Sequence, residues 1–279
     1  MRKVLITGNL GMLGSELSLA CEDQGDEVVG VDLPDGDITS RERLLGLIGE
    51  ADPEFIFHCA AFTKVDQCET EIATAMRVNA IGTQNVALAA ESLGVPMLYI
   101  STDYIFDGTK EGAYDEWDAA NPQSVYGKSK YAGECFVRQL SQWHYIVRVS
   151  WLIGKHGPNF IETILKLARE RDELRVVNDQ FGSPTFVTDL VPELLRLSES
   201  GAFGTYHITN RGVTTWYDLA KKALELRGVT TPILPCTTAD FPRPAPRPKN
   251  SQLSAMLYDL ALGNDMPTWE QGLKDYLRG

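Results

Sequence analysis

Residues 4–14, VLITGNLGMLG, indicate the fold class, because a short apolar run leads directly into three regularly spaced glycines. Gly8, Gly11 and Gly14 form the pattern Gly-x-x-Gly-x-x-Gly. Residues without a Cβ allow a tight turn and a close approach of the backbone to a pyrophosphate, while the N-terminus of the following helix attracts phosphate charge. The position of the motif between an expected strand and an expected helix predicts a dinucleotide-binding turn.

Short apolar runs alternate with helical patterns over the first 150 residues. Expected strands lie at 4–6, 28–31, 55–57, 97–100 and 145–149, and expected helices at 13–24, 41–48, 73–92 and 124–140. Such alternation with short connections specifies a parallel sheet covered by helices on both faces. We therefore predict an α/β protein with a Rossmann-like doubly wound sheet over residues 1–150. Its ligands should bind in the loops after the carboxyl ends of the strands.

The pattern becomes irregular after about residue 150. Helices are expected at 159–171, 187–200, from 214 or 215, and at 268–277, with strands at 174–177 and 206–208. We predict a smaller substrate-binding lobe over 151–279, interleaved with the first domain at its edges. The segment PRPAPRP at 242–248 is stiff and extended. We interpret it as an ordered loop whose arginines face a pocket, the alternative being a ligand for a proline-binding module.

The composition argues against several classes of protein. A net charge of −12 disfavours nucleic acid and anionic membranes as partners. Five cysteines without a Cys-x-x-Cys pair and four scattered histidines predict neither a disulfide framework nor a metal site. No apolar run reaches the length of a signal peptide or a membrane span, so we expect a cytoplasmic protein. An anionic substrate would need a locally basic pocket, for which the candidates are Arg148, Arg243, Arg247 and Lys249.

The end of the second expected strand carries a clue to the cofactor. Asp32 stands there, and a carboxylate at this position accepts hydrogen bonds from a ribose diol and repels a 2′-phosphate. The sequence therefore favours NADH over NADPH without excluding either. The alternative interpretation of Asp32 is a turn-forming residue before Leu33 and Pro34.

Tyr126 and Lys130 form the pattern Tyr-x-x-x-Lys. Side chains four residues apart share one face of a helix, so the phenol and the ammonium should point into the same cavity. Ketone reduction needs a proton donor at the carbonyl oxygen, and a nearby ammonium is expected to lower the pKa of the phenol towards neutrality. Ser101 and Thr102 follow the fourth strand, and spacing alone leaves open which hydroxyl would polarise the ketone.

Several longer motifs make the sequence similar to the dTDP-4-dehydrorhamnose reductases, an extended branch of the short-chain dehydrogenases, nearly from end to end. The most discriminating is STDYIFDG at 101–108, because most sugar epimerases of the superfamily differ there. The other motifs are AAFTKVD at 60–66, VNAIGTQN at 78–85, YGKSKYAGE at 126–134, RVSW at 148–151, QFGSPT at 180–185 and RPKNS at 247–251.

The resemblance implies roles for particular residues. Thr102, Tyr126 and Lys130 would be catalytic, and Thr102, Asp103, Tyr104, Trp151 and Arg247 would contact a nucleotide-linked sugar. Independently of the resemblance, Asn79 is a mediocre helix former in an apolar stretch, and we expect it to support Lys130 through water, the alternative being a residue on the helix surface. The expected cofactor-binding residues are Gly8, Leu10, Gly11, Met12, Leu13, Gly14, Asp32, Asp37, Ile38, Ala60, Ala61, Thr63, Asn79, Tyr126 and Lys130.

The expected activity is the NAD(P)H-dependent reduction of the C4 ketone of dTDP-4-dehydro-6-deoxy-L-mannose to dTDP-L-rhamnose, a step of polysaccharide biosynthesis. One alternative is a nucleotide-sugar 4-epimerase or dehydratase with tightly bound NAD. Another is a non-catalytic regulatory subunit on the same fold, which the intact Tyr126, Lys130 and Thr102 argue against. The resemblance also allows a homodimer.

Overall fold

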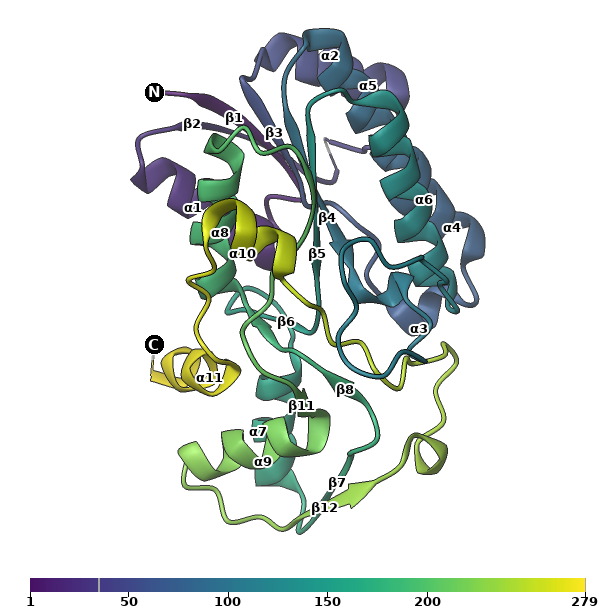
Figure 1. Cartoon of the computed structure of the whole chain (residues 1–279), viewed down its shortest axis with the longest axis vertical. Coiled ribbons are helices and arrows are strands. Elements are labelled where there is room, and N and C mark those ends of the chain that lie inside the picture. The colour runs from purple at the N-terminus through teal and green to yellow at the C-terminus, as the bar shows by residue number, and fades with distance from the viewer. Residues whose placement is uncertain (35, 279) are drawn as a thin grey trace.

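A computed structural model describes residues 1–34 and 36–278, and a six-stranded parallel sheet lies at its centre (Figure 1). The strand order is β10-β5-β4-β3-β1-β2, and every pairing is parallel. The α/β doubly wound fold predicted from the sequence is confirmed. The strands are β1 (Lys3–Thr7), β2 (Glu27–Val31), β3 (Phe55–His58), β4 (Met97–Thr102), β5 (His144–Val149) and β10 (Gly204–His207).

Helices cover both faces of this sheet, which is why its central strands are continuous apolar runs rather than alternating ones. Figure 1 shows α2 (Arg41–Ala51), α5 (Thr83–Leu93) and α6 (Val125–Leu140) on one side. The other side carries α1 (Met12–Asp23), α8 (Val187–Glu199) and α10 (Met256–Leu262). Each face has its own buried apolar cluster.

After β1 the chain adds β2 on one side of it and then β3 on the other, so the strand order reverses between β1 and β3. The glycine-rich turn, which follows β1, lies at this point. Gly8 has φ +71°, and a Cβ there would lie 2.7 Å from the backbone of Ala60. A Cβ on Gly14 would lie 2.1 Å from the carbonyl oxygen of Gly8. Both positions therefore require glycine. Reversal points of this kind open a crevice at the carboxyl ends of the strands, where ligands of such folds bind.

The single helix predicted over 73–92 is wrong in its middle section. The chain forms α4 (Ile72–Met76), then a π-helical segment (Arg77–Gly82), and then α5. The widened turn contains Asn79, which is fully buried and hydrogen-bonds both the loop after β3 and Ser129 of α6. Helical periodicity does not distinguish a π turn from an α turn, because the difference depends on tertiary partners.

A second region lies beyond the carboxyl ends of the strands and has its own apolar core. Within the described residues it contains three helices and three short strand pairs. The helices are α7 (Phe160–Glu170), α9 (Trp216–Leu226) and α11 (Trp269–Arg278). The strand pairs are β6 (Leu152–Ile153) with β9 (Thr185–Phe186), β7 (Leu174–Val177) with β12 (Ile233–Cys236), and β8 (Phe181–Gly182) with β11 (Thr214–Thr215).

The chain after residue 150 contributes to both regions. It builds the second region, but α8, β10 and α10 return to cover and extend the central sheet. Short elements complete the description: α3 (Val65–Cys68), and 3-10 turns at Asp103–Ile105 and Thr238–Asp240. Among the described residues, no helix is long and apolar enough to cross a membrane.

Candidate active site

One cavity of about 610 Å³ lies at the carboxyl edge of the sheet, between the two regions. It brings together most of the residues predicted to bind cofactor or substrate. Leu10, Asn79 and Arg247 do not line it. The predicted residues that do are Gly8, Gly11, Met12, Leu13, Gly14, Asp32, Asp37, Ile38, Ala60, Ala61, Thr63, Thr102, Asp103, Tyr104, Tyr126, Lys130 and Trp151.

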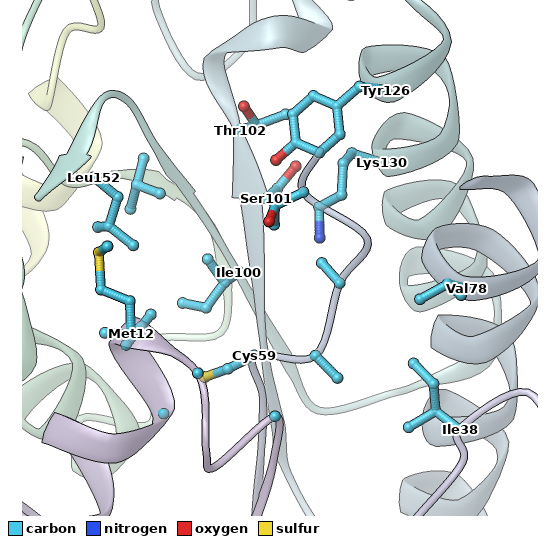
Figure 2. Close-up of a pocket in the computed structure, with 18 of the residues that line it drawn as sticks. Met12, Ile38, Cys59, Val78, Ile100, Ser101, Thr102, Tyr126, Lys130 and Leu152 are labelled. Carbon is cyan, nitrogen blue, oxygen red and sulfur yellow. The ribbon is translucent and has the colours of Figure 1, made fainter. Parts of the chain in front are cut away.

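The three residues predicted to be catalytic lie together on one side of the cavity. In Figure 2, Thr102 at the end of β4 faces Tyr126 and Lys130 of α6, while Met12 and Leu152 lie across from them. Ser124 is the N-cap of α6, and its hydroxyl accepts a hydrogen bond from the backbone N–H of Gly127 at 3.1 Å. This cap fixes the first turn, so that the phenol and the ammonium point into the cavity as the spacing predicts.

Lys130 is buried against an aromatic ring. Its Nζ lies 4.2 Å from the centre of the Tyr99 ring, and the Tyr99 hydroxyl donates a hydrogen bond to the Lys130 carbonyl at 3.2 Å. Burial lowers the pKa of Lys130 to about 7, and the attraction of Glu134 opposes that shift only in part. The structure therefore contains an ammonium that titrates near neutral pH.

The expectation of a lowered pKa for Tyr126 is wrong for this structure. Burial raises the pKa of the Tyr126 phenol, and hydrogen bonding with the Thr102 side chain opposes that shift. The negative charge of Asp103 raises it further. Desolvation of the phenolate therefore has a larger effect on the pKa of Tyr126 than the nearby ammonium has.

The two adjacent hydroxyls after β4 have different surroundings. Ser101 donates to Glu134 Oε1 at 2.6 Å, so its hydroxyl is bonded within the buried network behind the cavity. Thr102 Oγ1 donates to Asp103 Oδ1 at 2.9 Å and accepts from the Tyr104 backbone N–H at 3.2 Å. The other oxygen of Asp103 is buried without a hydrogen-bond partner among the described residues, and burial raises the pKa of this carboxyl to about 6.

A buried ion pair holds α6 against the sheet. Arg148 of β5 donates from Nε and Nη2 to the two oxygens of Glu134, each at 2.9 Å, and from Nη1 to the Glu116 carbonyl at 3.1 Å. Both side chains are 3% exposed or less. The suggestion that Arg148 belongs to a basic substrate pocket is therefore wrong, because its guanidinium is already paired inside the protein.

Asp32 lies on the side of the cavity that is proposed to bind the cofactor, and it is bonded to the backbone there. Its carboxylate accepts hydrogen bonds from the backbone N–H groups of Leu10 at 3.1 Å and Leu33 at 2.8 Å. It thus holds the glycine-rich turn and also lines the cavity.

The interpretation of Asn79 as a helix-surface residue is wrong, since its side chain amide donates hydrogen bonds to the Phe62 carbonyl and the Ser129 hydroxyl in the interior.

Aromatic side chains form the side of the cavity that belongs to the second region. Trp151 has φ +46° and stacks on Trp216, with ring centres 3.7 Å apart and planes 12° apart. Both line the cavity, but only Trp151 was predicted to do so. The only local signal of Trp216 is its place directly after Thr215, the N-cap of α9, which indicates a helix start and no function.

Three other lining residues, Cys59, Ile100 and Val149, were not among the predicted site residues, although Cys59 directly precedes the predicted Ala60 and Ala61. These three stand at or beside the carboxyl ends of β3, β4 and β5. The rule that ligands bind at those ends would have found them.

Arg247 lies outside the main cavity. Its Nη1 is 2.9 Å from Asp66 Oδ1 of α3, and the same oxygen accepts the backbone N–H of Ala245 at 3.2 Å. Burial raises the pKa of Asp66, but the Arg247 guanidinium outweighs that effect and holds it below its usual range. Arg247 lines a small adjoining cavity of about 70 Å³, which shares Tyr104 with the main one. The proline-rich segment is thus attached to the first region through Asp66.

The residues present fit a dinucleotide. The turn around Gly8 leaves backbone close to the cavity where a Cβ would collide with Ala60, and it leads into the N-terminus of α1. Within residues 1–34 and 36–278, no group of three or more metal-ligating side chains is found. A glycine-rich turn at the reversal point, with a tyrosine and a lysine four apart on a helix beside it, defines an oxidoreductase of the short-chain dehydrogenase type.

Comparisons with known proteins narrow this class. A family model described as the RmlD substrate binding domain matches residues 1–279. The dTDP-4-dehydrorhamnose reductase of Aggregatibacter actinomycetemcomitans is 39% identical over 291 residues, covering 99% of this chain and 98% of that protein. The chain belongs to the dTDP-4-dehydrorhamnose reductase family.

Two solved structures agree with this assignment. A dTDP-4-dehydrorhamnose reductase from Clostridium acetobutylicum has a TM-score of 0.97 and 42% identity, with 99% of this chain and 98% of that chain covered. The Bacillus anthracis reductase, solved in complex with NADP, has a TM-score of 0.97 and 41% identity, with 99% of each chain covered.

Proposed function

We propose that this protein reduces the C4 ketone of dTDP-4-dehydro-6-deoxy-L-mannose to dTDP-L-rhamnose, using a reduced nicotinamide dinucleotide. The observation that carries this proposal is the convergence of Thr102, Tyr126 and Lys130 on one cavity whose other end is the glycine-rich turn. The bound cofactor would supply the hydride. Side chains of this protein would bind the cofactor, polarise the carbonyl group and supply the proton.

Each catalytic residue has a task that its surroundings suit. Burial raises the pKa of Tyr126, which keeps the phenol protonated at neutral pH and able to protonate the alkoxide that forms at C4. Thr102 would donate to the carbonyl oxygen after its hydroxyl turns from Asp103. Lys130 would hold the cofactor ribose and adjust the acidity of Tyr126.

The proposal includes a substrate-binding lobe formed mainly by residues 151–279. Trp151 would contact the sugar, together with Asp103 and Tyr104 of the first region, because all three line the cavity beside Tyr126. Arg247 would bind the nucleotide diphosphate by exchanging its bond to Asp66 for one to phosphate. Arg243 could assist, since it lies in the same proline-rich segment.

For the cofactor we propose a preference for NADH. The Asp32 carboxylate lines the cavity at the end of β2 and would repel the 2′-phosphate of NADPH. The solved Bacillus anthracis relative contains NADP, so NADPH is the alternative to be measured alongside. The cytoplasmic location and the homodimer remain predictions from the sequence.

The test is direct. Purified protein is mixed with enzymatically generated dTDP-4-dehydro-L-rhamnose, and the absorbance of the reduced nicotinamide is followed with NADH and NADPH in parallel. Rapid loss with either cofactor would establish the reductase, and the ratio of the two rates would decide the preference. Protein that is purified with bound NAD and needs no added cofactor would favour the epimerase. Stable association with another enzyme, without turnover, would favour a regulatory subunit.

A further inference from the structure

Trp151 has an unusual backbone conformation for a bulky residue. Its φ of +46° lies in the left-handed region, which side chains of this size rarely adopt, and such outliers are found at ligand sites more often than elsewhere. Neighbouring bonds fix the backbone around it. Its carbonyl accepts the Thr185 N–H at 3.2 Å, and the Ser150 hydroxyl donates to the Ser183 carbonyl at 2.5 Å. The strain therefore persists because surrounding structure maintains it.

Trp216 is the main support of the Trp151 ring. The two indoles are nearly parallel, with centres 3.7 Å apart. Trp216 is itself fixed, because it is the first residue of α9 after the N-cap Thr215, and because the Phe160 ring packs against it at 4.5 Å. An indole held between two neighbours provides a rigid surface on which Trp151 can stack.

Gly182 limits the Trp151 ring from another direction. A Cβ at this position would lie 2.7 Å from Cε2, 2.8 Å from Cζ2 and 2.9 Å from Nε1 of Trp151. Gly182 belongs to β8, which pairs with β11, and β11 ends immediately before Trp216. One small strand pair therefore positions both neighbours of the Trp151 ring, so that the ring has one place to occupy.

We propose that Trp216 is a positioning residue for the reductase. By stacking on Trp151 it holds that indole against the deoxyhexose of the nucleotide sugar, whose C–H face and methyl group suit an aromatic surface. The inference rests on the proposed function and adds a residue to it. Trp151 and Trp216 line the same cavity as Thr102 and Tyr126, so a shift of the indole would move the sugar relative to the proton donor.

The experiment compares Trp216→Leu, Trp216→Phe and the wild type in steady-state reduction of dTDP-4-dehydro-L-rhamnose. For Trp216→Leu we expect kcat/KM for the nucleotide sugar to fall about tenfold to a hundredfold, the scale of losses seen when a substrate is misplaced by about 1 Å. Cofactor affinity, measured by quenching of protein fluorescence, should change by less than about twofold. Trp216→Phe keeps an aromatic face and should recover most of the loss.

Gly182→Ala provides an independent test, because it displaces the Trp151 ring without removing any aromatic side chain. It should lower kcat/KM for the nucleotide sugar while leaving cofactor affinity nearly unchanged. This test still applies if Trp216→Leu does not fold. Trp117→Leu is the matched control, since that side chain is 59% exposed and lies outside the cavity. It should keep wild-type kinetics.

Three results would overturn the inference. The first is an active wild-type protein whose kcat/KM for the nucleotide sugar is unchanged in both Trp216→Leu and Gly182→Ala. The second is an equal loss of sugar and cofactor affinity, which would mark a merely structural role. The third is the absence of wild-type turnover with either cofactor, and it alone would also overturn the proposed function.

Discussion

The two sides of the cavity are built in different ways. Thr102, Tyr126 and Lys130 stand on a six-residue strand and a sixteen-residue helix, and a buried ion pair joins that helix to the sheet. The opposite side rests on two-residue strands and a strained tryptophan, and the proline-rich segment beside the main cavity is attached through a partly exposed ion pair. Regular elements hold the groups proposed to do chemistry, while short and irregular ones surround the proposed substrate.

The buried and the partly exposed ion pair should also contribute differently to the free energy of unfolding. Removing one partner of a fully buried ion pair leaves an uncompensated charge in the interior, whereas an exposed pair contributes little and weakens with salt. Glu134 with Arg148 is of the first kind, and Asp66 with Arg247 is closer to the second. We therefore expect the catalytic side to be the more costly one to disturb.

The largest effect should come from Tyr126→Phe. Loss of the proton donor should lower kcat by about 10²- to 10⁴-fold, while binding of the dinucleotide stays near wild type. Tyr131→Phe is the control on the same helix, because Tyr131 packs against an apolar cluster outside the cavity and should keep full activity. Near-normal turnover of Tyr126→Phe would show that Tyr126 is not the proton donor, and that the side of the cavity that carries it is not the catalytic one.

Arg148→Met should destabilise the fold by about 3–5 kcal/mol, because Glu134 would remain charged and buried. Arg138 donates to the same carboxylate at 2.7 Å but is 34% exposed, so Arg138→Met should cost less than about 1 kcal/mol. Urea unfolding of both variants measures the difference. Equal losses would show that burial does not decide the strength of these two bonds.

Lys130→Met should raise thermal stability in the absence of cofactor, by a few kcal/mol at most. The folded pKa of about 7 lies below the ordinary value of about 10.4, so the unfolded chain binds a proton that the folded chain lacks between these pH values. The cost of burying the ammonium is thus complete below pH 7 and vanishes as pH rises towards 10. Melting curves across this range should show a gain that shrinks with pH, and Lys128→Met on the same helix should show none.

The smallest effect should come from Asp66→Asn. The ion pair with Arg247 is partly exposed, so its loss should cost less than about 1 kcal/mol, and salt should reduce the difference from wild type. The lowered pKa of Asp66 means that its contribution is present at neutral pH and is lost as the carboxyl protonates in acid. A loss as large as that of Arg148→Met would contradict the comparison of the buried and the partly exposed ion pair.

Local patterns along the chain were enough to predict several parts of the structure. The strands β1 to β5 were predicted because buried runs are readable along the chain, and the turn at Gly8 because only glycine permits it. The shared face of Tyr126 and Lys130 followed from helical spacing alone.

Long-range packing set the features that depend on partners distant in the chain. It placed β10 at the sheet edge beside β5, widened the helix at Asn79 and paired Arg148 with Glu134. It also brought Trp216 onto Trp151, although the two residues are 65 positions apart in the sequence. Periodicity records which face of an element is buried but not which side chain meets it, since that choice belongs to long-range packing.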